Sequence, residues 1–310
     1  MTKSILNTHS QISSFIHRTP VLTSSALNEI AGCELYFKCE NLQRMGAFKF
    51  RGAIHALLNL TDAEKAKGVI THSSGNFAQA LSLAAKSLNI PAYIVMPENA
   101  PRIKVEAVKG YGGIITLCPP TNEDREAYTQ QLIESKQLTF IHPSNDLNVI
   151  LGQGTSAFEL IQDITDLDYI FTPIGGGGLV AGTILAVNEN SPHTKVIGGE
   201  PKAVDDAYRS LISGKIELHT NDYTIADGLR THLGDINFPI IKAGIEKITR
   251  VEESEITAAM RLIWERMNII IEPSSAVAFA AVLKDKELLK DKKVGIILSG
   301  GNVDLTKLPF

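Results

Sequence analysis

The feature that most constrains the fold is an alternation of short apolar runs with longer segments of helical spacing. The short runs are rich in Val, Ile and aromatic residues and predict buried strands at 34–39, 69–72, 93–96, 113–117, 169–174, 195–199 and 294–298. Apolar residues three and four apart predict helices at 78–88, 102–109, 124–136, 155–163, 179–189 and 254–267. Because this alternation is typical of parallel βαβ units, we predict an α/β protein.

Length, charge and cysteine content narrow the function classes. At about 150 residues per domain, 310 residues predict two domains. The 30 basic and 34 acidic residues are mixed along the chain, so no basic block indicates a nucleic-acid partner. The longest uncharged stretch, 169–188, is interrupted by Pro173 and four glycines, which argues against a membrane span. Cys33, Cys39 and Cys118 form no CxxC pair, which favours a reducing, cytoplasmic compartment.

Glycine and serine clusters follow several of the predicted strands. The carboxyl ends of parallel strands meet at one edge of a sheet, and helices that begin there direct amide groups at anions. We therefore expect one shared ligand site from these clusters. They are Ser73, Ser74, Gly75 and Asn76 after 69–72, Gly175, Gly176, Gly177 and Gly178 after 169–174, Glu200 after 195–199, and Ser299, Gly300, Gly301 and Asn302 after 294–298.

The four consecutive glycines have two functional interpretations and one structural one. Without side chains, their amides can close around a phosphate at the start of a helix. Gly176, Gly178 and Ala181 also fit the GxGxxA pattern of dinucleotide-binding enzymes, with Glu200 as the ribose-binding acid. The structural alternative is a tight turn, although four glycines are costly in the entropy of the unfolded chain.

Lys49 lies between Phe48 and Phe50. Aromatic neighbours can desolvate a lysine, lower its pKa and make the free amine available for Schiff-base chemistry. A surface lysine is the alternative. The 73–76 cluster can receive a carboxylate or simply cap a helix. Ser299 can hydrogen-bond a heteroaromatic nitrogen or simply form part of a turn.

These motifs, in this order, resemble those of the fold type II pyridoxal-phosphate enzymes, and among them the serine/threonine dehydratases and serine racemases. The likeness runs from Arg18 to Asp304 and includes the segments 48–52, 73–76, 175–178 and 299–302. It implies two open, twisted, mostly parallel sheets flanked by helices. It also implies a large cofactor domain, 1–67 and 146–310, a small mobile domain, 68–145, and a homodimer.

The resemblance implies a role for each motif around pyridoxal 5'-phosphate. Lys49 would hold the cofactor covalently, Phe48 would pack on its ring and Asn76 would bond the ring hydroxyl. Gly175, Gly176, Gly177 and Gly178 would bind its phosphate, and Ser299 would face the pyridine nitrogen. Lys49 and Ser74 would be the catalytic groups, and the substrate would contact Ser73, Ser74, Gly75, Asn76 and Arg125. One cofactor would use all of these residues, so the dinucleotide-binding alternative loses its main support.

The resemblance also implies a metal site and leaves two departures. In this subfamily Glu200, Val204 and Asp206 would bind Mg²⁺ or Ca²⁺ through two carboxylates and a backbone carbonyl. Acids favoured at a helix start are the structural alternative. Phe77 stands where the family continues with His, and Ser144 stands where relatives have Phe or Asn.

The expected activity is dehydration and deamination of L-threonine or L-serine to a 2-oxo acid and ammonia. Racemisation of serine is the alternative, because it needs a second acid on the opposite face of the cofactor and Ser74 matches the family's candidate. Phe77 leaves open a third possibility, a relative that binds the cofactor without catalysis. For both enzyme activities the expected ligand is a small amino acid.

Overall fold

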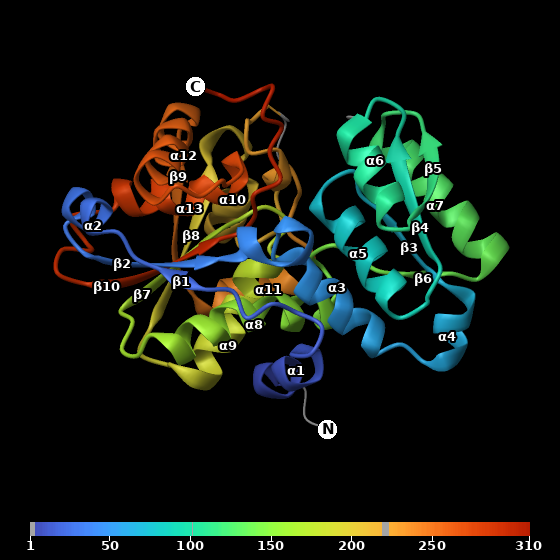
Figure 1. Ribbon diagram of the computed structural model, residues 1–310, viewed down its shortest axis with the longest axis horizontal. Coiled ribbons are helices and arrows are strands. Elements are labelled where there is room, and N and C mark those ends of the chain that lie inside the picture. Colours follow the sequence, from blue (N-terminus) through green and yellow to red (C-terminus); the bar gives the residue numbers. More distant parts are fainter. Residues whose placement is uncertain (1–3, 101, 219–222) are drawn as a thin grey trace.

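The computed structural model describes residues 4–100, 102–218 and 223–310. Its larger sheet has six strands in the order β1-β2-β10-β7-β8-β9, and every neighbouring pair is parallel except β1 with β2. Figure 1 shows this sheet on the left. The strands are β1 (Val21–Leu22), β2 (Glu34–Cys39), β7 (Tyr169–Pro173), β8 (Lys195–Pro201), β9 (Ile245–Val251) and β10 (Lys293–Leu298).

The smaller sheet has four parallel strands in the order β5-β4-β3-β6. They are β3 (Val69–His72), β4 (Ala92–Pro97), β5 (Ile114–Cys118) and β6 (Thr139–Phe140), so one continuous stretch of chain builds the whole sheet on the right of Figure 1. Two mostly parallel sheets confirm the predicted fold class. The division at residues 68 and 145 and the mobility of the small domain stay predictions.

Helices cover both faces of the larger sheet. The strand β10 shows why: Val294, Ile296 and Leu298 pack with α12 and α13, whereas Ile297 faces α8 and α9. Because successive side chains of a strand point to opposite faces of the sheet, β10 contributes to the hydrophobic core on each face. The helices of this half are α1 (Ile5–Ile12), α2 (Ser25–Ala31), α8 (Leu147–Asp163), α9 (Gly178–Asn190), α10 (Asp206–Ser213), α11 (Asn237–Gly244), α12 (Glu253–Met267) and α13 (Pro273–Lys284). The chain passes from this half to the smaller sheet through α3 (Lys49–Leu58) and α4 (Asp62–Lys67) (Figure 1).

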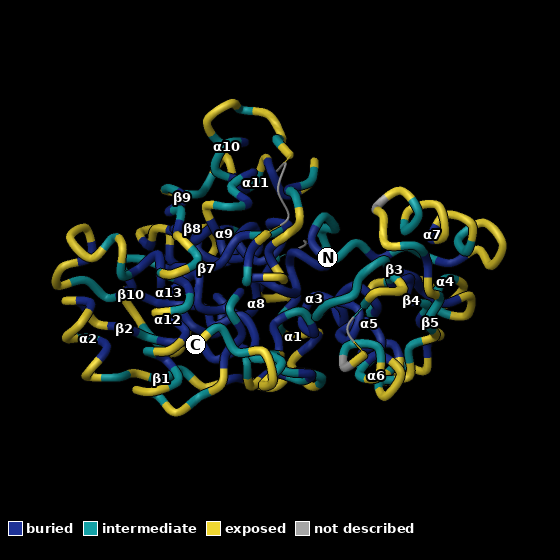
Figure 2. Tube along the Cα trace, turned by 90° about the horizontal axis from the view of Figure 1, so that it is seen from above, coloured by how far each residue is buried: buried dark blue, intermediate teal, exposed yellow. Residues whose placement is uncertain are grey.

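The smaller sheet is also sandwiched. The helices α5 (Asn76–Ser87) and α6 (Arg102–Gly110) contact each other on one face, and α7 (Asn122–Lys136) covers the other. Helix α3 packs against both α5 and α8, so it joins the two halves of the molecule. In Figure 2 the buried trace runs through α3 and α8, while the turns at the outer ends of both halves are exposed.

Most predicted elements are confirmed, with shifts of one or two residues at their ends. The largest correction is α8, which begins at Leu147 and not at 155. The Asp146 carboxylate accepts hydrogen bonds from the amides of Asn148 and Val149, which caps the helix. The elements β9, α1, α2 and α13 were not predicted from the sequence.

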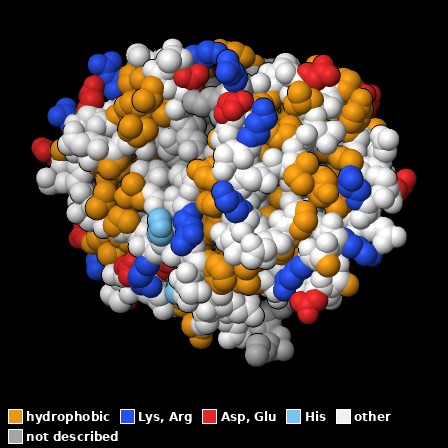
Figure 3. Space-filling model, turned by 45° about the vertical axis from the view of Figure 1, so that its right-hand side comes forward, with side chains coloured by type: hydrophobic (Ala, Val, Ile, Leu, Met, Phe, Trp, Pro, Cys, Tyr) orange, Lys and Arg blue, Asp and Glu red, His pale blue; other side chains and the backbone are white. Residues whose placement is uncertain are grey.

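Two further observations concern the cysteines and the length of the helices. Cys33, Cys39 and Cys118 are all free and buried. No helix in the described part of the chain combines the length and the apolar character that a membrane crossing requires. On the face drawn in Figure 3, basic and acidic side chains are interspersed.

Candidate active site

Lys49 is the first residue of α3 and points its amino group at the segment that connects the two sheets. The Lys49 Nζ donates a hydrogen bond to the Pro143 carbonyl at 2.9 Å. It lies 5.0 Å from the centroid of the Phe48 ring and 5.8 Å from that of Phe77. Burial of the amino group lowers the pKa of Lys49 to about 8, and the carboxylate of Glu272 only partly opposes this. With this pKa about a tenth of Lys49 is the free amine at pH 7, several hundred times the fraction for a lysine of ordinary pKa.

The turn before Lys49 is joined to the C-terminal glycine motif by backbone hydrogen bonds. The Phe48 amide donates to the Ser299 carbonyl at 3.0 Å, and the Gly301 amide donates to the Gly46 carbonyl at 2.9 Å. Ala47 and Gly300 form an antiparallel bridge. Residues about 250 positions apart in sequence are thus fixed side by side, with Ser299 buried beside Phe48.

Asn76 begins α5 and is held from two sides. Its Nδ2 donates to Glu272 Oε1 at 2.8 Å, and its Oδ1 accepts from Asn302 Nδ2 at 2.9 Å. Glu272 is 5% exposed, and burial, with a smaller effect of Asp227, raises its pKa to about 7. Glu272 was not among the residues predicted from the sequence. The available signal was an acid followed by Pro273 and, after two serines, by the apolar run 276–283.

The remaining predicted substrate residues lie at the carboxyl end of β3. The Gly75 amide donates to Ser73 Oγ at 3.3 Å, and a Cβ at Gly75 would meet no atom within 4 Å, so this turn is open. The charge of Arg125, on α7, helps burial to lower the pKa of His72, the last residue of β3. Arg125 therefore lies close to the strand end that carries the serine turn.

The four glycines form a turn that only glycine fits. Gly177 has φ of 79°, and α9 begins at Gly178. A Cβ would lie 2.7 Å from Leu229 Cα at Gly175 and 2.4 Å from Ser144 Oγ at Gly176. The turn presents bare backbone amides at a helix N-terminus, which is a site for an anion.

Arg51, two residues beyond Lys49, anchors the start of α3 in a buried ion cluster. Its guanidinium contacts both oxygens of Glu40 and both of Glu159 at 2.7–2.8 Å. Glu159 also binds Lys38 at 2.7 Å and His9 at 3.1 Å. Although burial opposes the charge, the two carboxylates hold the pKa of Arg51 above its usual range. The cluster ties α3 to β2 and α8.

The predicted metal residues lie together at the carboxyl end of β8 and just after it. Glu200 is 1% exposed, and its two carboxylate oxygens accept from the amides of Ala207 and Tyr208 at 2.8 and 2.9 Å. Val204 and Asp206 are buried in the adjoining turn and helix. In the described ranges, no three His, Cys, Asp or Glu side chains form a metal cluster. The predicted set has only two carboxylates.

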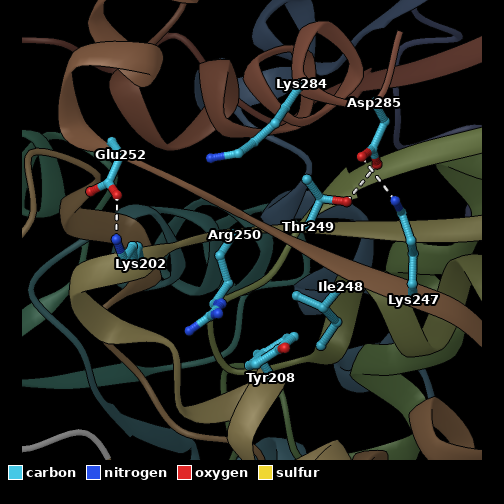
Figure 4. Close-up of a pocket in the computed structure, with 9 residues that line it drawn as sticks. All are labelled: Lys202, Tyr208, Lys247, Ile248, Thr249, Arg250, Glu252, Lys284 and Asp285. Carbon is cyan, nitrogen blue, oxygen red and sulfur yellow. Dashed lines mark hydrogen bonds and ion pairs between the residues drawn. The ribbon is translucent and has the colours of Figure 1, made fainter. Parts of the chain in front are cut away.

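A surface pocket of about 350 Å³ lies between β9, α10 and the end of α13, and its lining includes neither Lys49 nor the glycine turn (Figure 4). Each of its basic side chains is paired with a carboxylate at 2.5–2.9 Å, which makes it a solvent-exposed ion-pair network. The pairs are Lys202 with Glu252, Lys247 with Asp285, Arg250 with Asp205, and Lys284 with Glu255.

Comparison with known proteins gives the family. The model of the family described as "Pyridoxal-phosphate dependent enzyme" matches residues 12–300. The chain belongs to this family. It is 52% identical to a serine racemase of Dictyostelium discoideum (99% of this chain, 96% of the relative) and 47% identical to a β-hydroxyaspartate dehydratase of Paracoccus denitrificans (99% and 97%). The solved structure of the processed form of threonine deaminase isoform 2 from Solanum lycopersicum superimposes with a TM-score of 0.92 at 34% identity, covering 99% of this chain and 92% of that one.

The described residues fit pyridoxal phosphate. A buried lysine of lowered pKa, a glycine turn at a helix N-terminus and the Asn76–Glu272 pair would hold its aldehyde, phosphate and ring hydroxyl. Gln153 supplies a further observation, because its Oε1 is buried without a hydrogen-bond partner and would lie 2.5 Å from a Cβ at Gly178. A polar atom left in this state beside an anion cradle points to a ligand. With the family established, the dinucleotide-binding alternative is wrong.

Proposed function

We propose that the protein eliminates water from L-serine or L-threonine and releases a 2-oxo acid and ammonia. The observation that carries the proposal is the Lys49 amino group, held by the Pro143 carbonyl beside two aromatic rings, with a pKa lowered to about 8. An amine of that pKa is suited to take and return a proton near neutral pH.

The chain's own residues would perform the following steps. The open Ser73–Gly75 turn and the first amides of α5 would bind the substrate carboxylate, and Arg125 would add positive charge at the same edge. The Lys49 Nζ would take the α-proton, and the β-hydroxyl would leave with one proton as water. The released enamine would then add water and lose ammonia, which gives the 2-oxo acid. Bound pyridoxal phosphate supplies the sink for the electrons left on the α-carbon. The aromatic rings of Phe48 and Phe77 would exclude water from the amine.

Racemisation of serine is the second candidate, and Ser74 is the residue that favours it. Ser74 lies in the open turn before α5, whereas Lys49 begins α3, so the two groups come from different halves of the molecule. A racemase needs a proton donor on the face opposite to its base. The 52% identity to a protein named serine racemase also supports this candidate, and the Paracoccus relative's name adds 3-hydroxyaspartate as a substrate to test.

One assay separates these possibilities. The purified protein is incubated with L-serine, D-serine, L-threonine and 3-hydroxyaspartate, and both 2-oxo acid and enantiomer are measured. We expect 2-oxo acid from L-serine or L-threonine, complete loss in Lys49→Ala, and borohydride fixation of the cofactor on Lys49. Ser74→Ala should abolish inversion and spare elimination of the L-substrate. Bound cofactor without any turnover would identify a non-catalytic relative, and a label on another lysine would falsify the mechanism.

We further propose that Glu200, Asp206 and the Val204 carbonyl bind Mg²⁺ or Ca²⁺. The donor set is all oxygen, which these cations prefer, and both carboxylates are at most 2% exposed. Thermal unfolding with and without Mg²⁺ tests this proposal. We expect Mg²⁺ to raise the melting temperature of the wild type and not that of Glu200→Ala. Glu246→Ala, at an exposed carboxylate on β9, is the matched control and should keep the effect. An equal response in all three proteins would contradict the site.

On the family resemblance we also propose a homodimer located in the cytoplasm. Sedimentation equilibrium of the purified protein tests the first part, and a mass of about 33.6 kDa, that of one chain, would contradict it. Fractionation of cells expressing the tagged protein tests the second.

A further inference from the structure

The connection between β6 and α8 contains a turn closed by one side chain. The Nδ1 of His142 lies 3.1 Å from the Ser144 amide and 2.8 Å from the Asn145 amide, and both donate to it. An atom that accepts from two amides carries a lone pair. The hydrogen bonds therefore assign the ring proton to Nε2.

The same turn directs its carbonyl groups into the candidate active site. The Pro143 carbonyl accepts from Lys49 Nζ at 2.9 Å and from Gln153 Nε2 at 3.2 Å. The Ser144 carbonyl accepts from Asn237 Nδ2 at 3.1 Å, and the same nitrogen donates to the Gly176 carbonyl at 2.8 Å. One four-residue turn thus connects the catalytic lysine with the glycine cradle.

The surroundings keep the ring of His142 neutral and fixed. It packs edge-on to Phe140 at 6.0 Å and to His72 at 6.4 Å between centroids. Burial lowers the pKa of His142 to about 4, and the charges of His72 and Lys49 act in the same direction against Asp235. The hydrogen bonds from the Ser144 and Asn145 amides to Nδ1 therefore persist across the pH range in which Lys49 changes protonation.

We propose that His142 is a positioning residue that sets the Pro143 carbonyl as the acceptor for the Lys49 amino group whenever that group is free. An amine that donates one N–H to a fixed carbonyl has two positions left on its nitrogen, for the second hydrogen and the lone pair, so the lone pair is confined to two directions away from that carbonyl. The assignment rests on the proposed function, because it gives Lys49 the proton transfer. The hydrogen bonds from two amides to His142 Nδ1, which we call the cap, can be tested without any turnover.

Two substitutions separate the cap from mere filling of space. His142→Leu removes the acceptor. His142→Asn keeps an acceptor, because the Asn Oδ1 occupies a position similar to that of Nδ1. His193→Leu is the matched control, since His193 is exposed on the loop before β8. Retention of the cofactor's absorbance in each holoenzyme shows that the variants are folded.

The first readout is hydrogen exchange of the Ser144 and Asn145 amides in the holoenzyme. Loss of one hydrogen bond of about 1.4 kcal/mol corresponds to exchange faster by about tenfold. We expect this in His142→Leu, and wild-type protection in His142→Asn and His193→Leu. A wild-type spectrum with ¹⁵N-labelled histidine should show Nδ1 without a proton from pH 6 to 8. A protonated Nδ1 in the wild type would overturn the proposal whether or not His142→Leu folds well. Unchanged amide exchange in His142→Leu would also overturn it.

The second readout is the proton transfer. The reaction is followed with L-serine and with α-deuterated L-serine. We expect kcat of His142→Leu to be about tenfold below that of the wild type, with a larger isotope effect on kcat and KM within twofold of the wild-type value. In His142→Asn, kcat and the isotope effect should return to the wild-type values. Equal kcat in wild type and His142→Leu, or no recovery in His142→Asn, would overturn the role toward Lys49. A wild type that lacks turnover but protects both amides would contradict the proposed function and support the cap.

Discussion

Replacing Lys49 by Met tests the environment that makes this lysine reactive. Met has a similar length and no charge, so it removes the cost of placing an ammonium among Phe48, Phe77 and the Pro143 carbonyl. In cofactor-free protein the stability difference between the two forms then reports the burial of that charge directly. This difference should depend on pH in a manner fixed by the lowered pKa.

The sign and size follow from the pKa. The folded state lowers the pKa of Lys49 from 10.5 to about 8, so between these values the unfolded chain binds a proton that the folded chain has lost. The free energy of unfolding of the wild type, relative to that of Lys49→Met, therefore rises as the pH passes 8. If the pKa shift applies in full, this rise is about 2 kcal/mol between pH 7 and pH 9.5. Because the side chain is partly accessible to solvent, we expect about 1 kcal/mol.

Urea unfolding of both proteins, stripped of cofactor, at pH 7, 8.5 and 9.5 measures this difference. Other titrating groups are common to both chains and cancel. We expect Lys49→Met to be the more stable protein at pH 7, with its advantage shrinking as the pH rises. A difference that stays constant across this range, or that grows with pH, would show that Lys49 is not desolvated and would remove the main support for its proposed role.

Three further substitutions test other parts of the site. Lys104→Met breaks the ion pair between Lys104 on α6 and Asp227, which are 2.5 Å apart and join the two halves of the molecule. Because the pair is exposed, we expect a small effect, a roughly two- to fivefold rise in KM with little change in kcat. A fall in kcat alone would contradict this. Arg51→Met leaves two buried carboxylates without their main partner and should cost about 3–5 kcal/mol in urea unfolding; a loss under 1 kcal/mol would show the cluster to be dispensable. Glu272→Ala removes the acceptor of Asn76 Nδ2 and should weaken cofactor retention in dialysis about tenfold; unchanged retention would separate this pair from the cofactor.

The alternation of apolar and helical segments predicted the fold class because each half-buried element carries its own period. For two helices it failed because their burial is nearly complete. Helix α13 is apolar on all sides and packs among β7, β8 and α12, so it offers no contrast between faces. The first half of α8 is similar, since all residues from Val149 to Leu160 are buried. Such helices require knowledge of their neighbours.

The candidate site was predictable where side chains carry the chemistry. The serine turn and the glycine turn can be recognised in the sequence after predicted strands, and Lys49 can be recognised between two phenylalanines. Glu272 was missed because a single acid before an apolar helix looks like an ordinary cap. The Pro143 carbonyl could not be found at all, because every residue has a carbonyl and only the turn closed by His142 points this one at Lys49.

The place of β10 in the larger sheet has a consequence for biosynthesis. It lies between β2 and β7, yet it is the last strand in chain order. A ribosome that has completed β7 at Pro173 must add about 125 residues before Leu298 emerges, which takes roughly 6–25 seconds at about 5–20 residues per second. During that interval two apolar strand edges lack their shared partner, whereas the smaller sheet is already complete. The nascent chain therefore needs protection of these strand edges until β10 has been synthesised.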